Sequence, residues 1–167
     1  GHAFVRYADD CNVYVRSERA GVRALESLRG LFGKLRLRIN ESKSAVDRPW
    51  RRDFLGYSFW MRRGILKRRT GRTALATMKS RVRQLTARTG GRSMQSVVRD
   101  LSTYLTGIKS YWSLVETRSQ LEHLDEWIGH RLRQIQLKQW KRPHTIYREL
   151  RARGVTDVGA RRVAANA

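Results

Sequence analysis

The chain of 167 residues is poor in the side chains that build disulfides and zinc sites. It has one cysteine, Cys11, so an internal disulfide and a cysteine-based zinc site are both excluded. Its four histidines are scattered, and His123 and His130 lie seven residues apart on one predicted helix with no third ligand in view. We therefore expect these two side chains to lie at the surface rather than to bind a metal.

Long apolar runs are absent as well. No stretch approaches the length of a membrane span or of the apolar core of a signal peptide. Hydrophobic residues still make up 40% of the chain, which is enough for at least one core. The simplest prediction is a cytoplasmic protein of one ordinary domain or two small ones, with no membrane partner.

Acidic side chains are scarce relative to basic ones. The chain has 14 Asp and Glu against 36 Lys and Arg, for a net charge of +22. Residues 1–60 carry a net charge of +5 and residues 61–167 carry +17. Positive charges in such excess repel one another, and this favours a polyanionic partner. Because five Trp and six Tyr lie among the basic residues, stacking on bases is also available, and nucleic acid is the predicted partner.

A pair of adjacent carboxylates near the N-terminus is the most informative local feature. Asp9 and Asp10 separate the apolar run that begins at Phe4 from the run Val13–Val15, a pattern that predicts a β-hairpin with the acids at its tip. Neighbouring carboxylates repel each other, and Mg²⁺ prefers such oxygen ligands. The alternative is an ordinary polar turn, because Asp is common in turns.

The remaining pattern predicts an α+β protein. After the hairpin, Ser17 is a candidate helix N-cap, followed by a helix of about 16 to 18 residues. The segment Leu37–Ile39 alternates as a strand does, and a second hairpin runs from Phe54 to Lys67 with its turn at residues 61–63. The order strand–strand–helix–strand–strand–strand indicates a small antiparallel sheet with one covering helix.

From about residue 70 the hydrophobic period changes to that of helices only. The first predicted helix ends at Gly90–Gly91, the second is capped by Ser93, and the third runs to about Trp140 from a capping box of Ser119 and Glu122. A short helix from Thr145 to Gly154 follows. The predicted apolar stripes of the second and third helices are Met94, Val97, Val98, Leu101, Tyr104, Leu105 and Ile108, and Leu121, Leu124, Ile128, Leu132 and Ile135. The predicted domains are residues 1–70, residues 71–154 and a tail at 155–167.

Several motifs stand in the order in which one family has them. Residues 4–10 (FVRYADD) resemble the active-site strand–turn–strand of reverse transcriptases. Residues 37–44 (LRINESKS) resemble the segment L-x-[LI]-N-x-x-K-[ST] after the palm helix, and residues 54–57 (FLGY) resemble the hairpin that ends the palm. Residues 131–155 are similar to the maturase, or thumb, domain of bacterial group II intron reverse transcriptases. The resemblance covers nearly the whole chain.

The resemblance implies a bacterial, cytoplasmic RNA-directed DNA polymerase in which two Mg²⁺ ions support nucleotidyl transfer from a dNTP. It makes Asp9 and Asp10 the catalytic metal ligands. The residues that it places around the nucleotide and primer are Tyr7, Ala8, Asn40, Lys43, Phe54, Leu55 and Gly56. It implies a partial palm followed by a three-helix thumb that holds intron RNA and the RNA–DNA duplex. The basic residues expected to bind RNA are Arg62, Arg63, Lys67, Arg68, Arg69, Arg131, Arg133, Lys138, Lys141 and Arg142.

One departure from the family bears directly on activity. The family has a third metal-binding Asp, with the fingers, on a segment that precedes the YADD strand. We therefore expect the chain to be part of a larger enzyme, inactive by itself, that self-associates through its incomplete palm sheet. The alternative function is a non-catalytic RNA-binding maturase module that keeps its palm residues as a scaffold.

Overall fold

The N-terminal segment forms the predicted hairpin. In the computed structural model, which describes residues 2–166, strand β1 (Ala3–Tyr7) pairs antiparallel with β2 (Asp10–Tyr14). Tyr7 lies opposite Asp10, so the connection is a two-residue turn of Ala8 and Asp9. Among the described residues these strands pair only with each other, which leaves an unpaired edge on each. Cys11 lies on this hairpin, exposed and without a disulfide.

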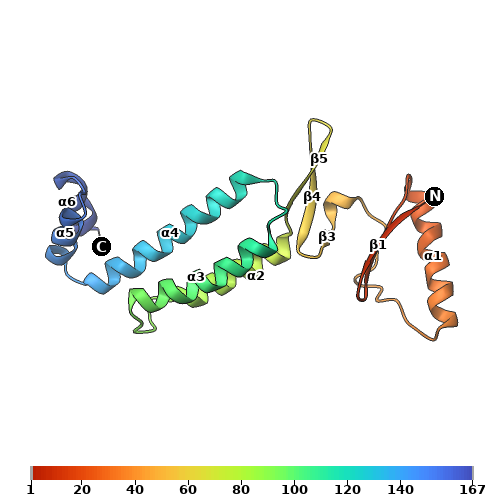
Figure 1. The fold of residues 1–167 in the computed structure, drawn as a ribbon, viewed down its shortest axis with the longest axis horizontal. Helices are drawn as coiled ribbons and strands as arrows, with labels where there is room; N and C mark the ends of the chain where they lie inside the picture. Colours follow the sequence, from red (N-terminus) through yellow and green to blue (C-terminus); the bar gives the residue numbers. More distant parts are fainter. Residues whose placement is uncertain (1, 167) are drawn as a thin grey trace.

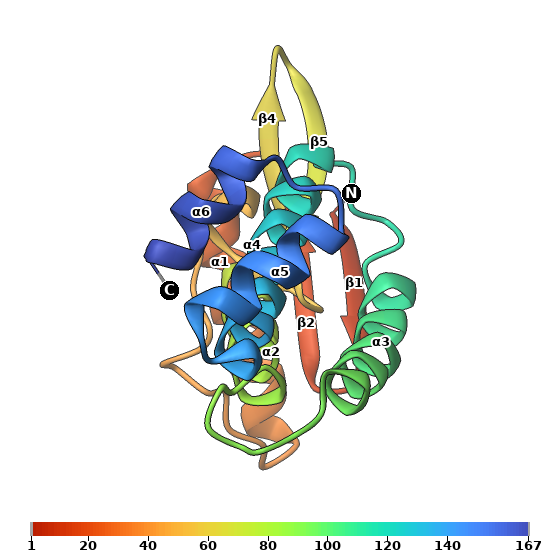
Figure 2. The ribbon, with the colours of Figure 1, turned by 90° about the vertical axis from the view of Figure 1, so that its left-hand side faces the viewer.

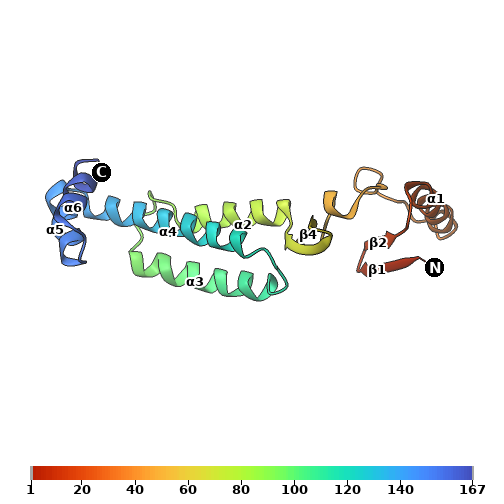
Figure 3. The ribbon, with the colours of Figure 1, turned by 90° about the horizontal axis from the view of Figure 1, so that it is seen from above.

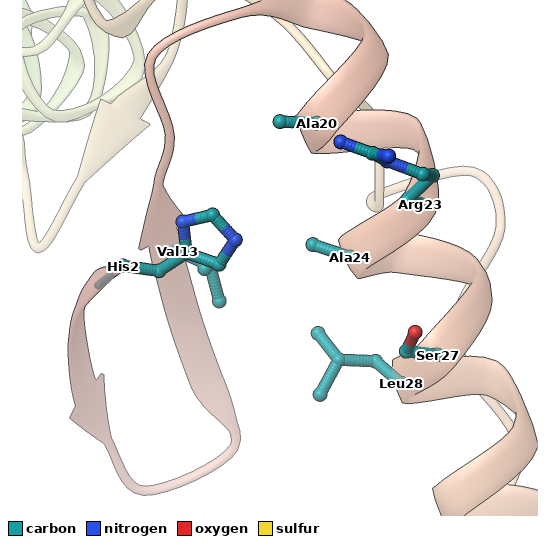
Figure 4. Close-up of a pocket in the computed structure, with 7 residues that line it drawn as sticks. All are labelled: His2, Val13, Ala20, Arg23, Ala24, Ser27 and Leu28. Atoms are coloured by element: carbon teal, nitrogen blue, oxygen red, sulfur yellow. The ribbon is translucent and has the colours of Figure 1, made fainter.

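Helix α1 (Glu18–Lys34) confirms the predicted helix and its cap. The Ser17 hydroxyl accepts a hydrogen bond from the Ala20 backbone N–H at 3.2 Å. The helix lies beside β2, but the two leave an open groove in which Val13 faces Ala24 and Leu28 (Figure 4). Because Leu35 is 67% exposed, the apolar face of α1 covers the hairpin only in part.

The strand predicted at Leu37–Ile39 does not form. The Asn40 side chain accepts hydrogen bonds from the Ser42 hydroxyl at 2.7 Å and from the Lys43 backbone N–H at 3.3 Å, which closes a turn. Such local bonds compete with strand pairing, and among residues 2–166 no strand lies against this segment. A short 3-10 helix, η1 (Pro49–Arg51), follows.

Strands β3 (Asp53–Phe54), β4 (Tyr57–Arg62) and β5 (Ile65–Thr70) form a second antiparallel sheet. The single small sheet predicted for the palm is therefore two separate sheets. The β4–β5 turn lies at Arg63–Gly64 and so begins two residues later than predicted, because positive φ angles of 51° and 76° there give the turn type that matches strand twist. This hairpin projects away from the helices (Figures 1 and 2).

Three long helices pack together after the second sheet. They are α2 (Arg72–Leu85), α3 (Met94–Tyr111) and α4 (Arg118–Trp140). Their shared core consists of Met78, Val82, Leu101, Trp112, Leu124 and Ile128. The predicted stripe of α4 is confirmed, since Leu124, Ile128 and Ile135 are buried and Leu121 and Leu132 pack partly buried.

Three details of these helices differ from the prediction. Val98 is 42% exposed, since it lies one residue past the face on which Val97 is buried. Helix α2 ends at Leu85, five residues before Gly90. The next residue, Thr86, donates its hydroxyl hydrogen bond back to the Val82 carbonyl. The capping box does not form, because Thr117 is the N-cap residue of α4 and makes no side-chain cap bond.

A helical hairpin ends the chain. Helix α5 (Pro143–Ala152) begins two residues earlier than predicted, at a proline whose fixed φ suits the first turn. Helix α6 (Asp157–Ala165) occupies residues that were predicted to be a tail. Figure 2 shows α5 and α6 side by side, and Ala160 and Ala164 are buried at this contact with no large side chain to signal it.

The parts follow one another along a single long axis (Figures 1 and 3). The β1–β2 hairpin with α1 lies at one end, β3–β5 and the three-helix bundle in the middle, and α5–α6 at the other end. Across the described residues, no helix has the length and apolar character needed to cross a bilayer.

The exposed hairpin carries a prediction about association. Phe4 is 72% exposed and Tyr7 64% exposed on a strand with an unpaired edge, a combination that favours edge-to-edge pairing. We expect the sedimentation coefficient to rise with concentration and Phe4→Lys to suppress the rise. Met61→Lys, at an exposed apolar position of the other hairpin, is the matched control and should leave it unchanged. A monomer at all concentrations would contradict this expectation.

Candidate nucleic-acid interface and carboxylate turn

The carboxylate pair lies at the exposed tip of the first hairpin. Ala8 has a φ of 52°, a left-handed conformation that a non-glycine residue rarely adopts, and the Arg6 guanidinium donates to its carbonyl at 2.8 Å. Tyr7, Asp9 and Asp10 are all exposed. A positive φ at the first position of a two-residue hairpin turn matches the twist of the flanking strands, as at Arg63, so this geometry belongs to the hairpin itself.

The carboxylate turn does not by itself make a complete metal site. Within residues 2–166, no three or more His, Cys, Asp or Glu side chains gather where they could hold a metal ion. Asp9 and Asp10 therefore offer two carboxylates, suitable in kind for Mg²⁺ but fewer than a two-ion site needs.

The structure does not join Asn40 and Lys43 to the carboxylates. In the described part of the chain no hydrogen bond or ion pair links either residue to Asp9 or Asp10. Instead, the Lys43 carbonyl accepts from the Arg52 guanidinium, which ties this turn to η1 and β3. Their predicted role beside the nucleotide stays a prediction.

The turn Phe54–Tyr57 is fastened to the helical bundle. The Tyr111 hydroxyl donates to the Leu55 carbonyl at 2.7 Å, and the Tyr57 hydroxyl donates in turn to the Tyr111 carbonyl. Gly56 has a φ of 72°, and a Cβ there would lie 3.0 Å from the Tyr111 ring and hydroxyl, so no larger residue fits without displacement. A shallow groove between this turn, α2 and α3 runs past Ala74.

A second set of contacts holds β5 against the start of α4. Glu116 accepts from the Arg68 backbone N–H at 2.9 Å and from its guanidinium at 3.1 Å, and these bonds lower the pKa of Glu116. Gln120 accepts from the Thr70 backbone N–H at 3.3 Å. The second hairpin and the bundle are thus bonded to each other at several points, which favours a fixed relative orientation.

The basic residues of the second hairpin divide into two groups. Arg62 and Arg63 are exposed at the projecting end, while Arg68 is paired with Glu116. Lys67 and Arg69 are half-buried, and the Nε of Arg69 is buried without a hydrogen-bond partner. Arg62 and Arg63 are therefore the freest of the five to meet an anion.

The predicted basic residues of α4 are not equivalent. Arg133 and Lys138 are exposed, as are Lys141 and Arg142 just after the helix. Arg131 instead points inward, where its Nε donates to the Thr86 hydroxyl at 2.6 Å and its Nη2 to the Thr86 carbonyl at 3.2 Å. It satisfies carbonyls at the end of α2, a structural role that was not predicted from the sequence.

Cations outside the predicted RNA-binding set lie beside two tryptophans. Lys79 and Arg83 of α2 lie near the Trp127 ring, and the Arg153 guanidinium lies 4.8 Å from the centroid of Trp140. The spacing of Lys79 and Arg83 places both on one face of α2. Nothing in the sequence placed Trp127 of α4 against that face. His123 and His130 are exposed, as predicted.

These observations define an α+β protein whose larger part is a basic helical bundle, joined to two small hairpins. Comparison with protein families gives the more particular assignment. Residues 75–154, from within α2 to just past the end of α5, match the maturase-specific domain of group II introns. The match confirms the resemblance noted for residues 131–155. No curated protein matches the chain.

Proposed function

We propose that the chain binds group II intron RNA through its helical part and assists the folding or splicing of that RNA as a maturase. The match of residues 75–154 to the maturase-specific domain carries this proposal. The charge distribution supports it, since residues 61–167 hold the +17 excess that favours a polyanion. Exposed cations at Arg62, Arg63, Arg133 and Lys138 are free to contact phosphates.

A second function, RNA-directed DNA synthesis, is favoured by a different observation. The carboxylates Asp9 and Asp10 stand next to each other at the tip of the β1–β2 hairpin, Asp9 in its two-residue turn and Asp10 at the start of β2. In this proposal residues 1–70 are palm, α2–α4 are thumb, and Asp9 and Asp10 hold Mg²⁺ with a further carboxylate that residues 2–166 do not supply. Bound Mg²⁺ would supply charge stabilisation at the transferring phosphoryl group.

The other palm residues have supporting roles in this second proposal. Tyr7 and Ala8 border the primer terminus and the incoming dNTP, with Asn40 and Lys43 behind them. The turn Phe54–Gly56 holds the primer strand, and its bonds to Tyr111 fix it relative to the helices that hold the RNA–DNA duplex.

RNA binding is the test of the first function. If about six phosphates are neutralised, log affinity should fall against log salt with a slope of roughly −4 to −5. A chain lacking residues 1–48 keeps β3–β5 and helices α2–α6, and it should retain most of the affinity. Titration of both chains with a folded intron RNA at several salt concentrations measures this. A flat salt response, or loss of binding on removing residues 1–48, would refute the assignment to the helical part.

A further inference from the structure

Three cations gather around one indole ring between helices α2 and α4. The Lys79 Nζ lies 5.7 Å from the ring centroid of Trp127, the Arg83 Cζ lies 5.5 Å from it, and the Arg131 Cζ lies 5.7 Å from it. Lys79 and Arg83 come from α2, whereas Trp127 and Arg131 come from α4. The fold therefore brings together charges that lie more than forty residues apart in the sequence.

Arg131 is held in place without any ligand. Its guanidinium donates to the Thr86 hydroxyl and carbonyl, and to the Arg83 carbonyl at 3.4 Å. Thr86 is fully buried. Burial, together with the positive charges of Arg83 and Arg88, lowers the pKa of Arg131. The cluster is thus built on an anchored cation, and its like charges remain close despite their mutual repulsion.

No carboxylate balances this group within residues 2–166. Arg68, Arg92 and Arg118 each form an ion pair with an acidic side chain. Lys79 and Arg83 form none in the part of the chain that the structure describes, although Asp125 and Glu126 lie on the same helix as Trp127. Uncompensated cations fixed near one another favour a ligand that carries negative charge.

We propose that Lys79, Arg83 and Arg131, gathered around Trp127, form a binding site for the sugar–phosphate backbone of RNA. The proposal rests on the RNA-binding function proposed above and assigns it to the surface between α2 and α4. Phosphate is favoured over a stacked base because three cations already lie near the indole ring. Arg offers the planar pair of donors that suits phosphate oxygens, and Lys adds a mobile charge.

The test compares two double variants of the full chain that lose the same charges at different places. In K79Q/R83Q the cluster loses its two unpaired cations. In the control, R81Q/K109Q, one Arg and one Lys are removed from exposed positions on α2 and α3, away from Trp127. At about 0.1 M salt we expect K79Q/R83Q to lose at least roughly tenfold in RNA affinity, and its salt slope to become shallower by about 1.5 to 2. The control should lose less than about threefold.

The variant K79R/R83K keeps both positive charges. Its RNA affinity should stay within about threefold of wild type and its salt slope should be unchanged, which shows whether the charges or the exact side chains matter. An independent measurement uses the wild-type chain. The indole N–H resonance of Trp127, assigned from W127F, should shift when inorganic pyrophosphate is added. Equal losses in both double variants, or an indole resonance that pyrophosphate leaves unmoved, would overturn the site. If wild type itself shows no salt-dependent RNA binding, the proposed maturase function fails instead.

Discussion

Asp9→Asn should abolish Mg²⁺-dependent primer extension in an enzyme in which this chain is combined with a segment that supplies the missing carboxylate. The substitution removes the charge at a turn that holds only two carboxylates, and a metal site loses affinity steeply when a charged ligand becomes neutral. We expect a loss of at least about a thousandfold, since two-metal chemistry depends on fixing both ions. RNA affinity should stay within about twofold, because the change adds no phosphate repulsion and lies far from the helical bundle in sequence.

Asp125→Asn is the matched control for this substitution. Asp125 is also an exposed aspartate that forms no ion pair in the described part of the chain, but it lies on α4. Primer extension on an RNA template and RNA titration should be measured for both variants. Extension unchanged by Asp9→Asn would make the acid pair an ordinary polar turn. If the combined protein bound RNA tightly but never extended a primer, the non-catalytic maturase function would stand alone.

The sequence predicted local structure best where the signal is carried by neighbouring residues. Ser17 and Ser93 were predicted as caps, and both accept the expected backbone N–H bonds at 3.2 Å. The carboxylate turn was also predicted, because apolar alternation on both sides of Asp9 leaves only the turn for the acids. Each of these depends on contacts within four residues along the chain.

The failures occur where a distant partner decides the outcome. Leu37–Ile39 alternates like a strand, but no strand of residues 2–166 lies beside it and Asn40 closes a turn instead. Helix α6 was missed because its buried contacts use Ala160 and Ala164, and alanine gives little periodic signal. The bond that anchors Arg131 to the end of α2 was not predicted, because the sequence does not show that Thr86, 45 residues earlier, accepts it.

For the candidate sites too, local features were predicted from the sequence and contacts between distant residues were not. The motifs placed Asp9 and Asp10 in one hairpin and residues 54–57 in another, but they did not reveal that Tyr111 of α3 bonds to the second of these turns. The cluster around Trp127 depends on two helices meeting, and the charge excess alone does not say where the charges converge. Composition therefore predicted the class of ligand, whereas the fold is needed to locate the surface.

Leu101→Ala should have the largest effect on the stability of the helical bundle. Leu101 is 3% exposed and lies in the core shared by Met78, Trp112 and Leu124, so truncation removes apolar contacts and leaves a cavity. A loss of about 2 to 5 kcal/mol in the free energy of unfolding is expected. That loss is a large part of the roughly 5 to 15 kcal/mol that stabilises an ordinary domain.

Two neighbouring valines of α3 make the sharper comparison. The helical period alone predicted both Val97 and Val98 to be core, yet Val97 is 1% exposed and Val98 is 42% exposed. Val97→Ala should therefore cost roughly 2 kcal/mol, because it deletes two buried methyl groups, whereas Val98→Ala should stay within about 0.5 kcal/mol. Urea denaturation followed by circular dichroism gives both values from the shift in midpoint. Equal costs for the two valines would mean that α3 is rotated from the position described.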